Sequence, residues 1–348
     1  MERCLAPASN KSYNAFAHLE GDYLRQIIFL SALCFVFFAM TAAVAAPNEM
    51  KGFVQISNGR KLYVDWIKAQ PGKDTLVLLN GLTYETTSWN QFVQQFQATG
   101  YGIFRYDPVG MGQTLAAYGP VQAPIMIENQ AMDLNLLTNA VGLTGKLNLL
   151  GLSYGGGLAI VFAGLYPQRI GKAILMCPYT EVLASQDSMI KQEIAATRLT
   201  YPLNPATDEE LYAYFLRQIV YFDDPIAEPS MLNSPLKPEA VFQMTQGLRK
   251  YNVLRASQNF PAGTVHLVMA GQDQYIPRQV LMQFWNQLPP ASRMSRMLVD
   301  LSEHKIPEAY PVFAARWVDA IMKGQDGTQA GKAYEANPIT GQIVPSSP

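Results

Sequence analysis

Residues 147–157 read LNLLGLSYGGG, an apolar run that passes directly into a glycine-rich turn. The run 147–150 predicts a buried strand, and the glycines predict the opening of a helix. Ser153 stands on the turn between them, where a tight backbone exposes the hydroxyl and where flanking side chains larger than glycine would clash. The helix N-terminus behind it supplies free N–H groups and partial positive charge. Ser153 is therefore the predicted nucleophile.

A serine hydroxyl needs a base, and histidine is the usual one. The chain has 3 histidines. His18 precedes a predicted export segment and is excluded, and His266 lies inside the predicted strand 265–269, where a structural role is expected. His304 follows the apolar stretch 297–301, in a loop from which a side chain can reach a site. We therefore predict that His304 is the base.

The base needs an orienting carboxylate. Asp273 comes just after the predicted strand 265–269, between a glycine and a proline, and is the predicted acid. Glu181, which follows an earlier strand, is the alternative acid. The order Ser153, Asp273, His304 matches the chain order expected for a nucleophile on this kind of turn. All three side chains would lie beyond the C-terminal ends of parallel strands, the usual site position in such sheets.

A tetrahedral oxyanion needs preorganised hydrogen-bond donors. One predicted donor is the backbone N–H of Tyr154, the residue after the nucleophile. The other is the N–H of Leu82, in the loop after the short apolar run 75–79. Asp107 follows another predicted strand, and its glycine-rich surroundings predict a structural turn.

The remaining chain alternates short apolar runs with helical patterns, which indicates an α/β fold with a mostly parallel, doubly wound sheet. A hairpin is expected around residues 57–60, and this core spans residues 47–181 and 262–322. Residues 182–261 are helical in pattern and punctuated by prolines, which predicts an inserted helical subdomain. Residues 323–348 are polar and aperiodic, so we expect a disordered tail.

The charge balance excludes several classes of protein. Charged residues make up 15% of the chain, and 26 Lys and Arg nearly cancel 27 Asp and Glu. A nucleic-acid-binding protein would carry a basic excess, so no nucleic-acid partner is expected. The few, scattered histidines and cysteines argue against a metal site, and the predicted chemistry requires no metal or organic cofactor.

The N-terminal residues 1–46 contain an uncharged apolar run, residues 27–46. Its small-residue end predicts an export signal cleaved near Ala45, which would place the protein in the periplasm or outside the cell. The run is also long enough to remain as a membrane anchor, so membrane attachment stays open. Cys4 and Cys34 fall in this segment, so Cys177 is alone in the body and the fold has no internal disulfide.

These features together resemble the α/β-hydrolase superfamily, in its serine-nucleophile branch with a helical cap. The resemblance covers about residues 52–322 and includes the nucleophile turn, the Asp-x-x-Gly-x-Gly-x-Thr turn at Asp107, the Gly-x-Asp-x-x-x-Pro segment and the late histidine. It implies that residues 182–261 form the family's cap. The chain departs from the pattern by having Asn80-Gly81 where His-Gly is common, and Glu303 where glycine often precedes the histidine.

The expected function is a serine hydrolase that cleaves an ester or related acyl bond through an acyl-enzyme on Ser153. Alternatives on the same residues are an acyltransferase, an amidase or aminopeptidase-like enzyme, a perhydrolase, or a ligand-binding protein that retained the fold without turnover. The partner is a small acyl substrate, and the oligomeric state is not specified. Aromatic residues of the insert suggest an apolar substrate pocket, although packing of the insert's own core explains them equally: Tyr212, Tyr214, Phe215, Tyr221 and Phe222.

Overall fold

The computed structural model describes residues 48–346 apart from positions 83, 120, 182–183 and 219–235. Within these residues, strands alternate with helices over most of the chain, as the apolar runs predict. The strands are β1 (Glu49–Gln55), β2 (Lys61–Ile67), β3 (Thr75–Leu79), β4 (Gly102–Asp107), β5 (Leu147–Leu152), β6 (Ile170–Met176), β7 (Val265–Ala270), β8 (Arg293–Val299), β9 (Lys332–Ala336) and β10 (Ile343–Pro345). The α-helices are α2 (Asn90–Phe96), α3 (Gly112–Tyr118), α4 (Ile127–Ala140), α5 (Tyr154–Leu165), α6 (Ala184–Thr200), α7 (Asp208–Gln218), α9 (Lys237–Arg249), α10 (Val253–Ala256), α11 (Arg278–Gln287), α12 (Ile306–Ala309) and α13 (Pro311–Lys323).

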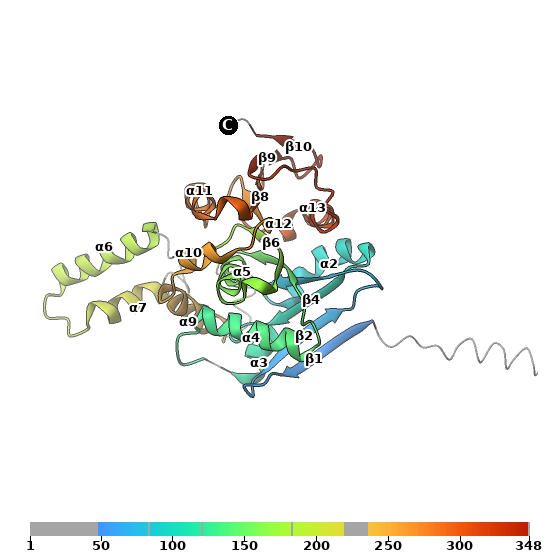
Figure 1. Ribbon diagram of the computed structural model, residues 1–348. Helices are drawn as coiled ribbons and strands as arrows, with labels where there is room; N and C mark the ends of the chain where they lie inside the picture. The colour runs from blue at the N-terminus through green and yellow to red at the C-terminus, as the bar shows by residue number, and fades with distance from the viewer. Residues whose placement is uncertain (1–47, 83, 120, 182–183, 219–235, 347–348) are drawn as a thin grey trace, which may run out of the picture. The chain divides into compact units, whose positions relative to one another are not determined.

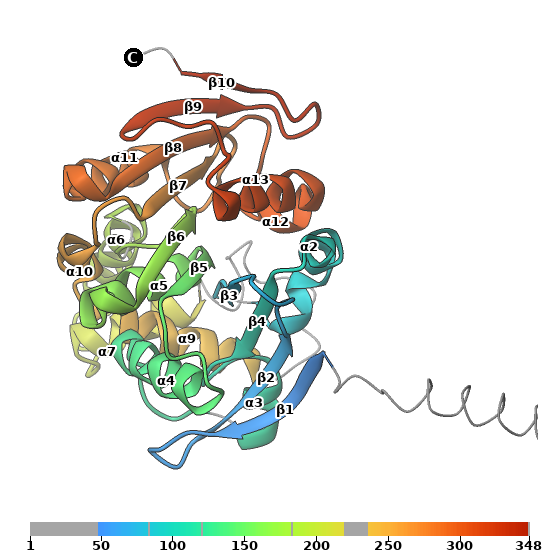
Figure 2. The ribbon, with the colours of Figure 1, turned by 45° about the vertical axis from the view of Figure 1, so that its right-hand side comes forward.

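The strands of the described residues form one sheet (Figure 1). Their order is β1-β2-β4-β3-β5-β6-β7-β8-β9-β10, which can be followed in Figure 2. From β4 to β9 in this order the strands run parallel. The predicted hairpin β1–β2 joins β4 antiparallel, and β10 pairs antiparallel with β9. The predicted fold class, an α/β fold with a mostly parallel sheet, is confirmed.

Strand β3 illustrates why helices cover both faces of the sheet. Leu76 and Leu78 face one side, and Val77 and Leu79 face the other; all four are fully buried. Helices α2, α12 and α13 pack over the first side, and α4, α5 and α11 pack over the second (Figure 2). A strand buried on both faces reads as an unbroken apolar run, which is the pattern in the sequence.

Helices α6, α7, α9 and α10 lie between β6 and β7, in the segment for which the prolines predict a helical insert. Ile190 of α6 and Leu211 of α7 are buried in the same apolar cluster as Val77 of β3. The insert therefore packs on the face of the sheet that α5 covers. Its role as a cap over a substrate site remains a prediction.

The expectation of a disordered tail over residues 323–348 is wrong for residues 323–346, the part that the structure describes. Strand β9 pairs in parallel with β8, and β10 pairs with β9. Tyr334 and Ala336 of β9 are buried in the cluster on the α13 side of the sheet. The free edge of β8 offers backbone groups to a partner strand, so pairing orders a segment too short and polar to show strand periodicity by itself.

Several sequence predictions fall outside the described residues. These include the apolar run 27–46 and the insert residues Tyr221 and Phe222. Among the helices that are described, none combines the length and the hydropathy needed to cross a bilayer.

Candidate active site

Ser153 occupies a strained turn between β5 and α5. Its φ of 54° and ψ of −117° lie where a side chain is rarely tolerated. The end of the neighbouring strand β6 and the loop after it hold this geometry. The Ser153 N–H donates to the carbonyl of Met176 at 2.9 Å, and the Ser153 carbonyl accepts from the Tyr179 N–H at 2.9 Å. The serine is half-buried at the start of α5, as the glycine-rich turn predicts.

Two glycines around Ser153 are required by close backbone contacts. A Cβ on Gly151 would lie 2.4 Å from the carbonyl oxygen of Gly155. A Cβ on Gly155 would lie 2.1 Å from the carbonyl oxygen of Leu79. The turn therefore brings α5 against the end of β3, where the loop that bears Leu82 begins.

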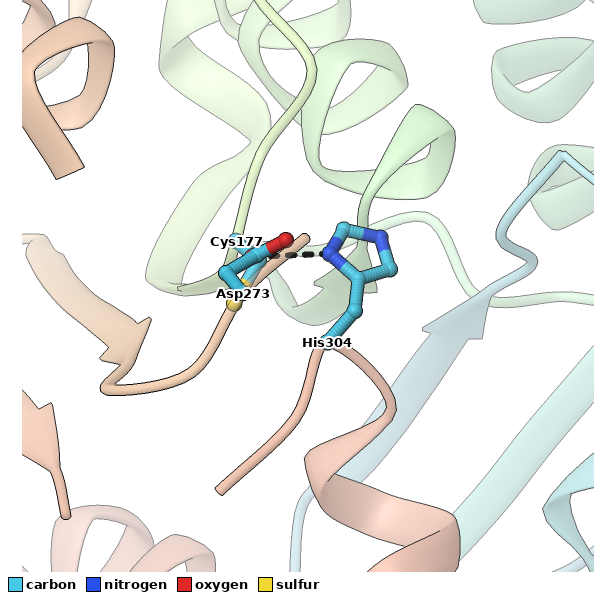
Figure 3. Close-up of side chains that lie close together, drawn as sticks. All are labelled: Cys177, Asp273 and His304. Carbon is cyan, nitrogen blue, oxygen red and sulfur yellow. Dashed lines mark hydrogen bonds and ion pairs between the residues drawn. The ribbon is translucent and has the colours of Figure 1, made fainter. Parts of the chain in front are cut away.

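Asp273 and His304 are hydrogen-bonded to each other across two loops. Asp273 Oδ2 lies 2.8 Å from His304 Nδ1, and Asp273 Oδ1 accepts the N–H groups of Tyr275 and Ile276 at 2.9 Å each (Figure 3). Burial alone would raise the pKa of Asp273, but the His304 hydrogen bond and charge, with the two N–H groups, hold this pKa below its ordinary value. Asp273 is thus stabilised as a carboxylate facing the imidazole.

The pairing determines the protonation pattern of His304. A carboxylate can only accept, so Nδ1 of the neutral ring carries the proton and Nε2 keeps its lone pair. Nε2 lies on the side of the ring away from Asp273 (Figure 3). Tyr275 packs edge-on against the ring, with centroids 5.0 Å apart. His304 is 7% exposed, so it is a mostly enclosed imidazole, and its Nε2 makes no hydrogen bond to any residue that the structure describes.

The three predicted catalytic residues all lie at the C-terminal ends of the parallel strands. Ser153, Asp273 and His304 follow β5, β7 and β8, which lie in the parallel array β5-β6-β7-β8. Because the C-terminal ends of parallel strands lie on the same side of the sheet, the three residues lie at the same end of the sheet. The structure joins Asp273 to His304, whereas the hydroxyl of Ser153 makes no hydrogen bond within the described part of the chain.

The alternative acid and the other candidate histidine lie elsewhere. Glu181 is exposed, and it is Asp273 that lies against His304. His266 is 2% exposed and its Nδ1 lies 2.8 Å from the Ser295 hydroxyl. Burial lowers the pKa of His266 to about 4, so it is a neutral structural histidine, as its strand position predicts.

The two predicted oxyanion donors lie on neighbouring elements. Tyr154 begins α5, and its buried side-chain hydroxyl donates to Gln130 Oε1 at 2.9 Å. Leu82 is half-buried in the loop after β3. A Cβ on Gly81 would lie 3.6 Å from the carbonyl oxygen of Leu152, so this loop lies beside the residue that precedes Ser153.

Cys177 is a neighbour of this site that the sequence did not assign to it. It follows β6, is fully buried, and has its thiol beside Asp273 and His304 (Figure 3). Burial, with the nearby Asp273 carboxylate, raises the pKa of this thiol well above its ordinary value, so it is not an activated nucleophile. Cys177, Asp273 and His304 hold ligand atoms within 4.8 Å of one another, the arrangement among the described residues that could bind a metal ion. In this structure Nδ1 of His304 is engaged by the carboxylate.

A small pocket opens beside His304. It holds about 170 Å³ and is lined by Gln274, Tyr275, Glu303, His304, Lys305 and Ala309. Burial lowers the pKa of Lys305, against the opposing effect of Glu308.

Comparisons with known proteins identify the family and the fold of this chain. A family model described as serine aminopeptidase, S33, matches residues 70–307. The 2-hydroxy-6-oxononadienedioate/2-hydroxy-6-oxononatrienedioate hydrolase of Burkholderia vietnamiensis (strain G4 / LMG 22486) is 31% identical over 129 residues, covering 35% of this chain and 42% of that protein. The matched part is thus less than half the length of this relative.

Solved structures show the same fold. A thermophilic esterase from Thermogutta terrifontis superposes with a TM-score of 0.57 at 16% identity, covering 80% of this chain and 99% of that one. An esterase from Exiguobacterium antarcticum gives a TM-score of 0.55 at 17% identity, covering 79% and 100%. The family model spans more than half of the chain, so this chain belongs to the serine aminopeptidase (S33) family of the α/β-hydrolase superfamily.

Proposed function

We propose that this protein is a serine hydrolase that cleaves an ester or related acyl bond through an acyl-enzyme on Ser153. The observation that carries the proposal is the Asp273–His304 hydrogen bond of 2.8 Å, at the sheet edge where Ser153 stands on its strained turn. A serine at the start of a helix, an imidazole with a free nitrogen and a carboxylate that orients the imidazole are the three parts that acyl transfer requires.

In the proposed mechanism, His304 Nε2 removes the hydroxyl proton as Ser153 Oγ attacks the substrate carbonyl. The N–H groups of Leu82 and Tyr154 stabilise the negative oxygen of the tetrahedral intermediate. His304 then gives its proton to the leaving group, and the acyl group stays on Ser153. A water molecule, activated by His304, hydrolyses the acyl-enzyme. Asp273 keeps the imidazole in the required tautomer and stabilises the positive charge that develops on it.

We propose a small or medium apolar acyl group as the substrate class, with the insert as its cap. The described aromatic residues of the insert give this limited support. Tyr212 is buried, and the Arg249 guanidinium carbon lies 3.6 Å from the centroid of the Tyr212 ring. Phe215 packs on the main apolar cluster. Tyr214 is 55% exposed. None of these contacts measures an acyl chain, so chain-length preference has to be measured with a series of p-nitrophenyl esters.

A second candidate is hydrolysis of a carbon–carbon bond in a 2-hydroxy-6-oxo acid. The curated relatives named for 2-hydroxy-6-oxononadienedioate favour it, at 31% identity over 129 residues. A comparison of kcat/KM for the two kinds of substrate separates these reactions. If a 2-hydroxy-6-oxo dienoate is cleaved with a kcat/KM far above that of any p-nitrophenyl ester, the carbon–carbon reaction replaces ester cleavage as the function.

We further propose that residues 1–46 direct export, with cleavage near Ala45. The uncharged run 27–46 and its small-residue end support this proposal. N-terminal sequencing of the mature protein from the periplasmic and membrane fractions tests it. An intact N-terminus in the membrane fraction supports an anchor instead.

A fluorophosphonate probe tests the enzyme class directly, because it reacts with an activated serine. The wild-type protein is expected to be labelled, and Ser153→Ala to lose the label and at least about 10³-fold in ester hydrolysis. Ser57→Ala, which changes an exposed serine in the β1–β2 turn, is the matched control and should be labelled as wild type. Equal labelling of wild type and Ser153→Ala would show that another residue is the nucleophile. A folded wild-type protein that takes no label would favour a binding protein.

A further inference from the structure

The loop that bears Leu82 is closed at its base by one carboxylate oxygen. Asp107 Oδ1 accepts the backbone N–H of Thr86 at 2.7 Å and the side-chain amide of Asn80 at 3.3 Å. Asn80 and Thr86 stand at the two ends of the loop, so both ends are held at the same atom. Asp107 is fully buried at the end of β4, and Gln113 N–H donates to its other oxygen at 2.9 Å.

The orientation of the Asn80 amide is determined by its partners. The indole Nε1 of Trp89 donates to Asn80 Oδ1 at 2.8 Å, and an indole N–H can only donate. The amide nitrogen must therefore face the other way, where it donates to the carbonyl of Tyr106 at 3.1 Å and to Asp107. Asn80 is 2% exposed, so these groups are shielded from bulk solvent. Its amide uses one acceptor and two donor positions at once.

The backbone of Asn80 also contacts the helix that carries the second donor. A Cβ on Gly155 would lie 2.8 Å from the Asn80 carbonyl oxygen, so no space separates the loop base from the first turn of α5. Tyr154, whose N–H is the other oxyanion donor, is the residue before Gly155. A shift of Asn80 therefore changes the position of Leu82 relative to Tyr154.

We infer that Asn80 is the positioning residue of the oxyanion hole: its side-chain amide, oriented by Trp89 and Asp107, sets the separation between the N–H groups of Leu82 and Tyr154. Oxyanion donors act only when they are aligned in advance with the charge that develops in the transition state. Asn80 thus holds the N–H groups of Leu82 and Tyr154 in alignment through an uncharged side-chain amide. The inference rests on the proposed function and assigns a role to a residue outside its catalytic set.

Asn80→Ala tests the inference through the separation of kcat and KM on a p-nitrophenyl ester. Removal of the amide is expected to lower kcat about 10- to 100-fold and to leave KM within about 2-fold, because a misplaced donor affects the transition state more than the bound ester. Trp89→Phe, which removes the indole donor and keeps a smaller aromatic ring, is expected to lower kcat about 3- to 10-fold. The double variant should lose less than the product of the two single effects, since both changes act through one amide.

The matched control is Asn148→Ala. Asn148 is also a buried asparagine, 7% exposed, and its Oδ1 accepts the Lys172 N–H at 3.0 Å in the half of β5 remote from Ser153. Its loss should lower the melting temperature without lowering kcat. An equal fall in kcat for Asn148→Ala and Asn80→Ala would overturn the inference, because general destabilisation would then explain both.

Two further outcomes separate the inference from the proposed function. If hydrolysis by the wild type depends on Ser153 while Asn80→Ala and Trp89→Phe keep kcat within about 2-fold, the inference is wrong and the function stands. If hydrolysis does not depend on Ser153, the proposed function itself fails. Should Asn80→Ala not fold, Trp89→Phe decides the question, because it keeps Asn80 and an aromatic side chain in place.

Discussion

Nδ1 of His304 lies 2.8 Å from Oδ2 of Asp273, although 31 residues separate them in the chain. The carboxylate is itself held by the N–H groups of Tyr275 and Ile276, so its position does not depend on the imidazole alone. This leaves Nε2 of His304 as the free, basic nitrogen. The pair thus has the geometry of a preoriented general base at the end of the sheet where Ser153 stands.

Asp273→Asn should lower kcat of ester hydrolysis by about 10³- to 10⁴-fold, because an amide nitrogen facing Nδ1 favours the wrong tautomer of His304. Fluorophosphonate labelling should slow in parallel. Glu181→Gln is the control, since Glu181 is the alternative acid and is exposed. A large loss in Glu181→Gln with little change in Asp273→Asn would assign the acid to Glu181.

His304→Ala should reduce kcat by at least about 10³-fold, while His266→Gln should keep kcat within about 3-fold. The reason is that His304 pairs with Asp273, whereas His266 lies inside β7 and pairs with Ser295. Steady-state kinetics of both variants with one p-nitrophenyl ester provide the measurement. The opposite ranking would identify His266 as the base.

His266 should make the stability of the protein depend on pH. Burial lowers its pKa to about 4 in the folded state, and an unfolded histidine titrates near about 6.5. Between these values the unfolded chain binds a proton that the native state does not, so the free energy of unfolding decreases as pH falls from about 6.5 to about 4, by on the order of 3 kcal/mol.

Urea denaturation of wild type and His266→Gln at pH 7 and pH 4.5 measures this dependence. The difference in unfolding free energy between the two proteins should change with pH, since glutamine does not titrate. A constant difference across this range would mean that His266 has an ordinary pKa in the folded protein.

Gly155→Ala should destabilise the protein by about 3 kcal/mol or prevent folding, because its Cβ would lie 2.1 Å from the Leu79 carbonyl oxygen. Gly145→Ala is the control, since a Cβ there meets nothing within 4 Å. It should be neutral or stabilise by about 0.4–1 kcal/mol through the unfolded state. Thermal melts of the two variants compare these effects, and a stable, active Gly155→Ala would contradict the tight turn.

The sequence by itself determined the strands of the sheet centre and the nucleophile turn. Strands such as β3 are buried on both faces, so they can be recognised in the sequence as unbroken apolar runs. Gly151 is also a local requirement, because its Cβ would meet the Gly155 carbonyl oxygen four residues later, whereas the close contact at Gly155 comes from Leu79 of a distant strand. Strand β9 escaped prediction, since its order comes from the free edge of β8 rather than from its own residues.

Only the tertiary structure decided which side chains meet. Asp273 and Glu181 both follow strands, but the sheet order places Asp273 against His304 and Cys177 beside them. The same order, with β4 beside β3, brings Asp107 to Asn80 and Thr86. A short sequence pattern predicts the local conformation of its own residues. The distance between two residues far apart in the chain depends on how the strands between them pack, and no short pattern encodes that packing.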